Sequence, residues 1–251
     1  MPRMRRPAAP AIAIGECTSP RESDHPPVQI DLTAEFRAAL PQGIFGALIV
    51  RECPNRPSPL ALAADQRTVE ARLRERFPGE TIDADPVARA YAVHFRRYGT
   101  RYPVVHQAKT ILSGRPIESP SALVEAMFTA EVDSLVLTSG HDLDILAGSL
   151  RVDVAREGEV YTKISGKEQA LKPGDMVVRD TEGIIASVLY GPDFRTRLRL
   201  ESQAALFGAW CPVGLTAEVA LAHLTGLAGL LRREWPDALI DPPRLFTAAT
   251  G

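Results

Sequence analysis

The chain has 251 residues, of which 45% are hydrophobic and 24% charged, and its formal net charge at pH 7 is −2. This composition is ordinary for a soluble globular protein, and no apolar run approaches the roughly 18–20 residues of a membrane helix, so neither a membrane nor a DNA partner is expected. The cysteines Cys17, Cys53 and Cys211 share no CxxC spacing, which indicates a reducing, cytoplasmic compartment without a disulfide framework or zinc site.

The first part of the chain predicts a tail, a short helix, a strand and a longer helix. Residues 1–28 are rich in Pro, Arg and Ser, which is typical of a flexible N-terminal tail. Residues 31–43 predict a short helix capped by Thr33. Residues 43–50 predict a buried strand, and the apolar spacing of residues 57–77 predicts an amphipathic helix.

Three short helices with similar punctuation follow, at residues 83–99, 102–114 and 118–132. Each has a proline near its start, and Asp85 and Ser119 are the expected N-caps of the first and third. The run from Arg89 to Arg115 carries six bases and no acid, whereas the run from Glu118 to Asp144 carries six acids and no base. Two interpretations stay open: solvated helix faces, or a basic docking patch for phosphates beside an acidic surface.

From Ser134 onward, short β-rich segments alternate with turn residues such as "EGE", "SGK" and "KPGD". Residues 216–235 then predict one more helix that ends before Pro236. The order of helices, strands and a last helix predicts an α+β fold with mostly antiparallel sheet layers flanked by helices.

The segment His-Asp-Leu-Asp at 141–144 stands just before a strand of clean alternation at residues 150–154. His141, Asp142 and Asp144 are suitable metal ligands, but in an extended segment the histidine points away from both aspartates. Without a second ligand cluster, no metal site is expected, and the alternative is an aspartate that caps a tight turn. Motifs of nucleophilic hydrolases, zinc peptidases and P-loops are missing.

Residues 195–201 predict a strand with two different faces. Three arginines and Glu201 share one face, while Thr196 and two leucines share the other. The strand is either a solvated edge or a strip that follows RNA phosphates by bidentate contacts and ends in a carboxylate acceptor. The residues expected to bind RNA are Arg195, Thr196, Arg197 and Arg199, together with the helix residues Arg96, Arg97 and Arg101.

The stretch "HDLDILAGSLRVDVAREGEVYTKISGKEQALKPGDMVVRD" resembles the B3/B4 domain of the phenylalanyl-tRNA synthetase beta subunit. The likeness is an ordered set of turns and strands that continues through "EGIIASVLYG" and "TRLRLESQ" and covers about residues 90–235. Because the chain is much shorter than that subunit, it is more similar to a freestanding B3/B4 protein. The resemblance implies one B3/B4-like domain over residues 29–240 and a C-terminal tail over residues 241–251.

In the synthetase this module is an editing site that hydrolyses tyrosine wrongly attached to the phenylalanine tRNA. Its pocket uses a threonine, a histidine, small residues and a glutamate. By the resemblance, the glutamate falls on Glu201, the small residues on Ala186 and Ser187, the threonine on Met127, and the histidine on Ser139, with His141 two residues on. The carboxylate is therefore kept, while two polar partners are replaced.

Three hypotheses about function follow. The first is trans-editing by an aminoacyl-tRNA deacylase that needs no cofactor and acts on the ester between an amino acid and the acceptor end of a tRNA. In it, Glu201 holds the ammonium group, and Ser139, His141 and Ser187 orient the ester or a water. The second is a non-catalytic module that binds RNA or a free amino acid. The third is a degenerate descendant without a ligand.

Overall fold

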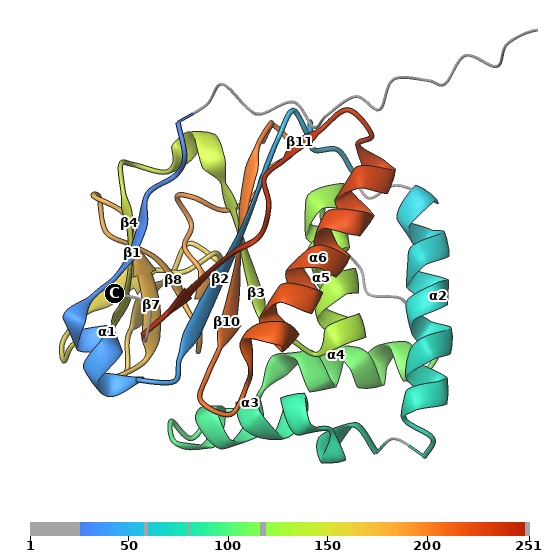
Figure 1. The fold of residues 1–251 in the computed structure, drawn as a ribbon, viewed down its shortest axis with the longest axis horizontal. Helices are drawn as coiled ribbons and strands as arrows, with labels where there is room; N and C mark the ends of the chain where they lie inside the picture. The colour runs from blue at the N-terminus through green and yellow to red at the C-terminus, as the bar shows by residue number, and fades with distance from the viewer. Residues whose placement is uncertain (1–25, 58–59, 80, 116–118, 249–251) are drawn as a thin grey trace, which may run out of the picture.

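A computed structural model describes residues 26–57, 60–79, 81–115 and 119–248. Its elements form layers, with one β-sheet in the centre, a second sheet on one side and helices α2, α5 and α6 on the other (Figure 1). The predicted α+β fold with antiparallel sheets flanked by helices is confirmed. The greater part of the predicted N-terminal tail, residues 1–25, lies outside the described residues.

The central sheet is built on two long buried strands, β2 (Ile44–Arg51) and β10 (Ala205–Cys211), in which every residue is buried. They pair antiparallel, and β10 also pairs with β3 (Thr138–Asp142), while β11 (Leu239–Ile240) lies on the other edge of β2. Sequences that are apolar without alternation are expected where both faces of a strand are covered. The buried strand predicted at residues 43–50 is thus confirmed.

The predicted C-terminal tail is corrected by β12 (Arg244–Thr247), which pairs antiparallel with β2 beside β11. The guanidinium of Arg37 donates to the carbonyl oxygen of Ala248 at 2.9 Å, and that of Arg244 donates to the carbonyl oxygen of Val28 at 2.7 Å. A four-residue strand carries no periodic signal of its own. It forms because β2 leaves an edge of backbone donors and acceptors that must be paired.

The second sheet has the strand order β1-β4-β7-β8-β9, with β1 and β4 parallel and the other pairs antiparallel. Its strands are β1 (Ile30–Leu32), β4 (Leu150–Val154), β7 (Met176–Arg179), β8 (Ile184–Ser187) and β9 (Gly191–Pro192). A separate hairpin pairs β5 (Val160–Thr162) with β6 (Glu168–Ala170). The alternation predicted for β4 holds for its first three residues, because Leu150 and Val152 are fully buried while Arg151 is exposed. Asp153, predicted on the same face as Arg151, is buried and bonded to Thr33 and Arg179.

The described helices are α1 (Ala34–Ala39), α2 (Leu60–Arg76), α3 (Pro86–Arg96), α4 (Pro103–Leu112), α5 (Ala122–Ser134) and α6 (Ala217–Glu234). Thr33 and Asp85 cap α1 and α3 as predicted, accepting bonds from Phe36 N and Val87 N. The expected cap Ser119 is wrong. Helix α5 begins two residues later than expected, because the N–H of Ala122 bonds to the carbonyl oxygen of Arg56. None of the described helices has the length and apolarity needed to span a membrane.

The strand predicted at residues 195–201 is replaced by turns. The Asp193 carboxylate accepts a bond from the N–H of Thr196 at 2.9 Å, and the Ser202 hydroxyl accepts one from the N–H of Arg199 at 3.0 Å. Only an isolated bridge between Arg197 and His141 keeps β pairing in this segment. Side-chain bonds to nearby backbone groups compete with sheet formation, and here they prevail over the alternating pattern.

Candidate functional site

Four buried polar side chains form a hydrogen-bonded chain where β3 meets the loop after β9. Ser139 and His141 share a face of β3 because they are two residues apart. The Nε2 atom of His141 lies 3.1 Å from the Ser139 hydroxyl, and its Nδ1 atom lies 2.8 Å from the Thr196 hydroxyl. The Thr196 hydroxyl in turn donates to Asp193. Each of these four residues is at most 5% exposed.

The protons of this chain can be assigned from its donors and acceptors. Thr196 gives its single hydroxyl proton to Asp193, so its oxygen accepts the Nδ1 proton of His141. Burial lowers the pKa of His141 to about 3, so the ring is neutral and its Nε2 atom accepts from the Ser139 hydroxyl. Trp210 Nε1 also donates to the Ser139 oxygen, at 3.1 Å. A serine that donates to a neutral imidazole has the geometry of general-base activation.

His141 and Asp142 lie at the end of β3, and Asp142 caps the following turn by accepting from the N–H of Asp144, as the turn interpretation of this segment predicted. One expectation is corrected by the hydrogen-bonded chain. Thr196, expected among the RNA-binding residues, is fully buried, so its hydroxyl serves the interior and not a surface contact.

Ser187 belongs to a separate buried pair. It lies on β8, and its hydroxyl donates to Asp175 Oδ2 at 2.5 Å. Asp175 is completely buried, and its burial raises the pKa of the carboxyl group to about 7. Within the described part of the chain, Asp175 Oδ1 has no hydrogen-bond partner. The neighbouring Ala186 is fully buried in the hydrophobic core.

The arginines of the 195–199 segment do not form the predicted strip. Arg195 holds both carboxylate oxygens of Asp180, at 2.7 and 2.8 Å. Arg199 pairs with Asp142 at 3.2 Å. The guanidinium of Arg197 lies 3.7 Å from the ring centroid of Phe194. Each side chain thus has its own partner, because the turns disperse the three arginines.

Helices α3 and α4 enclose a groove of about 710 Å³ with cationic side chains, called here the α3–α4 groove. Arg96 and Arg101, both expected to bind RNA, line it together with Arg89 and Lys109. Lys109 pairs with the lining carboxylate, Asp83, at 2.5 Å. Among the described residues, the three arginines form no ion pair, so their charge is available to an anion.

The floor of the α3–α4 groove is apolar. Ala88 and Tyr102 are buried there, and Ala92, Pro103 and Val105 complete the apolar lining. An apolar floor below a cationic rim matches the chemistry of a nucleotide, whose base is flat and whose phosphate is anionic. Arg97, expected alongside Arg96, is exposed but does not belong to this lining.

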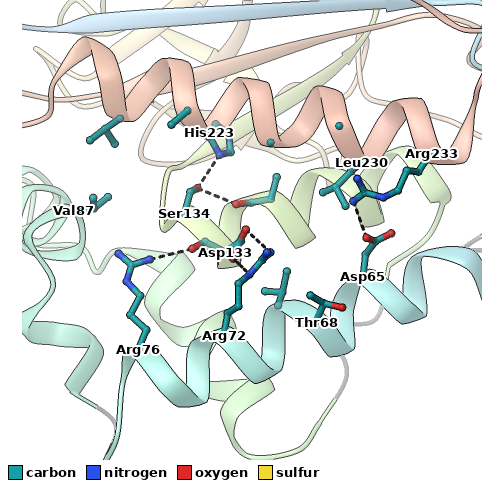
Figure 2. Close-up of a pocket in the computed structure, with 16 residues that line it drawn as sticks. Asp65, Thr68, Arg72, Arg76, Val87, Asp133, Ser134, His223, Leu230 and Arg233 are labelled. Atoms are coloured by element: carbon teal, nitrogen blue, oxygen red, sulfur yellow. Dashed lines mark hydrogen bonds and ion pairs between the residues drawn. The ribbon is translucent and has the colours of Figure 1, made fainter.

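A second groove, the α2–α6 groove, has a volume of about 610 Å³ and lies between α2 and α6 with α5 beneath it (Figure 2). Arg72 reaches from α2 to the Asp133 carboxylate on α5 at 2.7 Å, and Arg233 on α6 pairs with Asp65 on α2 at 2.7 Å. His223 is buried at its wall and is bonded to the Ser134 hydroxyl at 2.8 Å.

Comparison with known proteins relates the chain to one enzyme subunit. No protein-family model matches it. It is 30% identical over 180 residues to the phenylalanine–tRNA ligase beta subunit of Anaeromyxobacter dehalogenans (strain 2CP-C), a match that covers 62% of this chain and 22% of the relative. The chain is similar to the beta subunit of phenylalanine–tRNA ligase. It spans about a fifth of the length of that relative.

The fold supports the same similarity. An N-terminal fragment of the phenylalanyl-tRNA synthetase beta subunit from Pyrococcus horikoshii superposes with a TM-score of 0.50 at 11% identity. The match covers 88% of this chain and 52% of that fragment. At this identity the superposition shows a shared fold and nothing about shared chemistry.

The residues carried over from the synthetase editing pocket fall into three places. Met127 lies beside β3, since a Cβ atom built on Gly140 would be 3.3 Å from its sulfur, and Ser139 and His141 are on the same strand. Ala186 and Ser187 lie on β8. Glu201 is exposed at a turn. That these residues form one pocket, as the resemblance to the synthetase implies, stays a prediction.

Sequence reasoning missed one member of the hydrogen-bonded chain, Asp193, and one neighbour, Trp210. Asp193 stands in "GPDFRT", two residues before the predicted strand, where an aspartate three residues before a threonine N–H is a turn signal. Trp210 gave no signal at all, because it meets Ser139 only through the pairing of β10 with β3.

Proposed function

We propose that the chain is an RNA-binding module that receives the acceptor end of a tRNA in its α3–α4 groove. The observation that carries this proposal is the set of three arginines without ion pairs, Arg89, Arg96 and Arg101, around an apolar floor. The groove volume of about 710 Å³ lies in the range of ligand sites, roughly 300–1,000 Å³. The similarity to a tRNA ligase subunit supports RNA as the anionic partner.

The near-neutral net charge of −2 fits a local contact better than the wrapping of a whole tRNA. A single-stranded 3′ end offers unstacked bases, which proteins bind on apolar or aromatic surfaces while cations hold the phosphates. Tyr102 supplies an aromatic ring in the floor, and Arg96 and Arg101 supply cations at the rim. Arg195, Arg197 and Arg199 stay predicted contacts of the same RNA.

The test is fluorescence anisotropy with a labelled RNA hairpin that carries an acceptor stem and a single-stranded 3′ end. The double variant Arg96→Gln/Arg101→Gln removes two cations from exposed positions. Each lost phosphate contact lowers the slope of log affinity against log salt by about 0.7–0.9. We therefore expect the slope to fall by about 1.4–1.8 and the affinity at low salt to drop.

Arg232→Gln is the matched control, because Arg232 is an exposed arginine on α6 outside the groove. It should leave both affinity and slope unchanged. Equal loss in the control and the double variant would show non-specific attraction, and an unchanged slope in the double variant would exclude the groove as the RNA site.

A second candidate, aminoacyl ester hydrolysis, is favoured by the Ser139–His141–Thr196–Asp193 chain. In this proposal the Ser139 hydroxyl loses its proton to the neutral His141 ring as its oxygen attacks the ester carbonyl. The ring returns that proton to the tRNA hydroxyl that leaves, and a water then hydrolyses the seryl ester and releases the amino acid. Thr196 and Asp193 hold the tautomer that makes Nε2 the acceptor. Because all four side chains are buried, the substrate would reach them only after the 193–201 loop opens.

The panel test for this candidate uses mischarged tRNAs and the full chain. We expect Ser139→Ala to slow deacylation by about 10²-fold or more, since positioned general-base catalysis contributes about 10²–10⁴-fold. Ser187→Ala, in the separate pair with Asp175, tests whether that serine also orients the ester. Ser113→Ala, at an exposed serine after α4, is the control and should leave the rate unchanged. Glu201→Gln tests the carried-over carboxylate in the same assay. No deacylation above the buffer rate for any tRNA would remove the enzyme hypothesis.

A further inference from the structure

The α2–α6 groove is long. On α2 its lining runs from Asp65 to Arg76, which is about 17 Å of helix at 1.5 Å per residue. Its volume of about 610 Å³ lies in the range of small-molecule sites, roughly 300–1,000 Å³. It suits a small molecule with a single chain or ring, and it is separate from the α3–α4 groove.

Two glycines of α6 keep this groove open. Gly226 and Gly229 line it from inside an 18-residue helix, where glycine costs about 1 kcal/mol relative to alanine. A Cβ atom on Gly226 would meet nothing within 4 Å, and one on Gly229 would meet only Arg233 Nη1 at 3.7 Å. No close contact in the folded chain therefore explains these glycines, whereas a ligand lying along α6 does.

The charged groups of the groove are paired. Three guanidiniums, of Arg72, Arg76 and Arg233, and two carboxylates, of Asp65 and Asp133, line it. Asp85, which is not part of the lining, pairs with Arg76 and balances its charge. An anionic ligand therefore has to take the place of one of the lining carboxylates.

The pairs across the groove can be exchanged. The Arg72 and Asp133 side chains are 56% and 39% exposed, and such exposed pairs contribute only about 0–1 kcal/mol. Arg72 already holds the Asp133 carboxylate through two nitrogens, at 2.7 and 3.0 Å. It therefore presents the fork geometry that an incoming carboxylate needs. His223 takes no part, since both its ring nitrogens are bonded within the fold.

We propose that the α2–α6 groove binds a small carboxylate with an apolar body. The carboxylate pairs with Arg72 in exchange for Asp133, and the apolar body lies along Gly226 and Gly229 against Val69 and Leu230. This site is independent of the RNA contact, so either proposal can fail alone.

The test is isothermal titration calorimetry of the full chain with hexanoate, hexanamide and hexylamine as probes. We expect hexanoate to bind with a Kd of about 1 mM or tighter, and the uncharged and cationic probes not to bind. Arg72→Met keeps most of the side-chain stem and should weaken hexanoate binding about tenfold. Gly226→Leu fills the groove and should abolish binding while the protein stays folded.

Two control variants test whether loss of an arginine on α2, or an added leucine on α6, weakens hexanoate binding when the change lies outside the groove. Arg74→Met changes the neighbouring arginine of α2 that pairs with Glu70 outside the groove, and Thr225→Leu adds a leucine to an exposed position of α6. Both should bind hexanoate like the unmodified chain. The proposal is overturned by absence of hexanoate binding at about 10 mM, by equal binding of hexylamine, or by undiminished binding in a folded Gly226→Leu variant.

Discussion

Single residues of the hydrogen-bonded Ser139–His141–Thr196–Asp193 chain set its geometry and contribute to the stability of the fold. Thr196 holds one bond to His141 Nδ1 and another to Asp193, and neither partner can reach water. Thr196→Val keeps the shape and removes the hydroxyl, which leaves the buried Nδ1–H of His141 without an acceptor, while Asp193 keeps its bond from the backbone N–H of residue 196. We expect the free energy of unfolding in urea to fall by about 1–3 kcal/mol. Thr110→Val, whose hydroxyl is on the surface of α4, should change it by less than about 0.5 kcal/mol.

The buried Asp175 carboxyl group makes the protein less stable as pH rises. Burial raises its pKa from 3.8 to about 7, so between these values the folded protein keeps a proton that the unfolded chain has lost. Stability therefore falls as pH rises from about 4 to 7 and is level above that range. Asp175→Asn cannot ionise, so its stability relative to the unmodified chain should rise over this window by about 2–4 kcal/mol.

Urea titrations at several pH values measure this difference, and the exposed Asp237→Asn is the control. A difference that stays constant from pH 4 to pH 8 would mean that Asp175 is ionised in the folded protein.

At the scale of elements, α6 and β2 use glycine for opposite reasons. In α6, alanine at position 226 or 229 adds a methyl group into open space and removes the entropy cost of glycine. In β2, a Cβ atom on Gly46 would lie 2.8 Å from Leu224 Cδ1, so this glycine permits α6 to pack on the sheet. The same substitution should therefore stabilise one element and destabilise the other.

We expect Gly226→Ala and Gly229→Ala each to raise the free energy of unfolding by about 0.5–1 kcal/mol. Gly46→Ala should lower it by about 1–3 kcal/mol through overpacking. Thermal and urea unfolding of the three variants measure these changes. A loss of stability in both α6 variants would show that the groove tolerates no added methyl group.

At the scale of the whole molecule, the two ends of the described chain meet. Arg244 contacts Val28, Arg37 contacts Ala248, and β12 pairs with β2. Deletion of residues 244–251 should therefore expose the edge of β2 and cost at least about 2 kcal/mol, a fall in Tm of about 4–8 °C for a chain of this size. Deletion of residues 1–25, which the sequence predicts as a tail, is the comparison and should change Tm far less. Equal Tm values for the intact chain and the 244–251 deletion would contradict a structural role for β12.

Local patterns in the sequence are enough to predict the fold class and much of the local structure. The apolar run of β2, the alternation of β4 and the caps Thr33 and Asp85 are all local signals, because they depend on residues within one or two turns of each other. The base-only run from Arg89 to Arg115 contains α4 and most of α3, the helices that form the α3–α4 groove.

Which polar residues meet depends on how the elements pack against one another. Residues 195–201 alternate like a strand, yet bonds from Asp193 and Ser202 fold them into turns and disperse the arginines. Ser139 meets Trp210 across the β3–β10 pairing, and His141 meets Thr196 across a loop. β12 forms because β2 has an open edge. Apart from the local bonds of Asp193 and Ser202, these contacts join residues that are distant in the chain, so no local pattern encodes them. Burial then sets the protonation of His141 and Asp175.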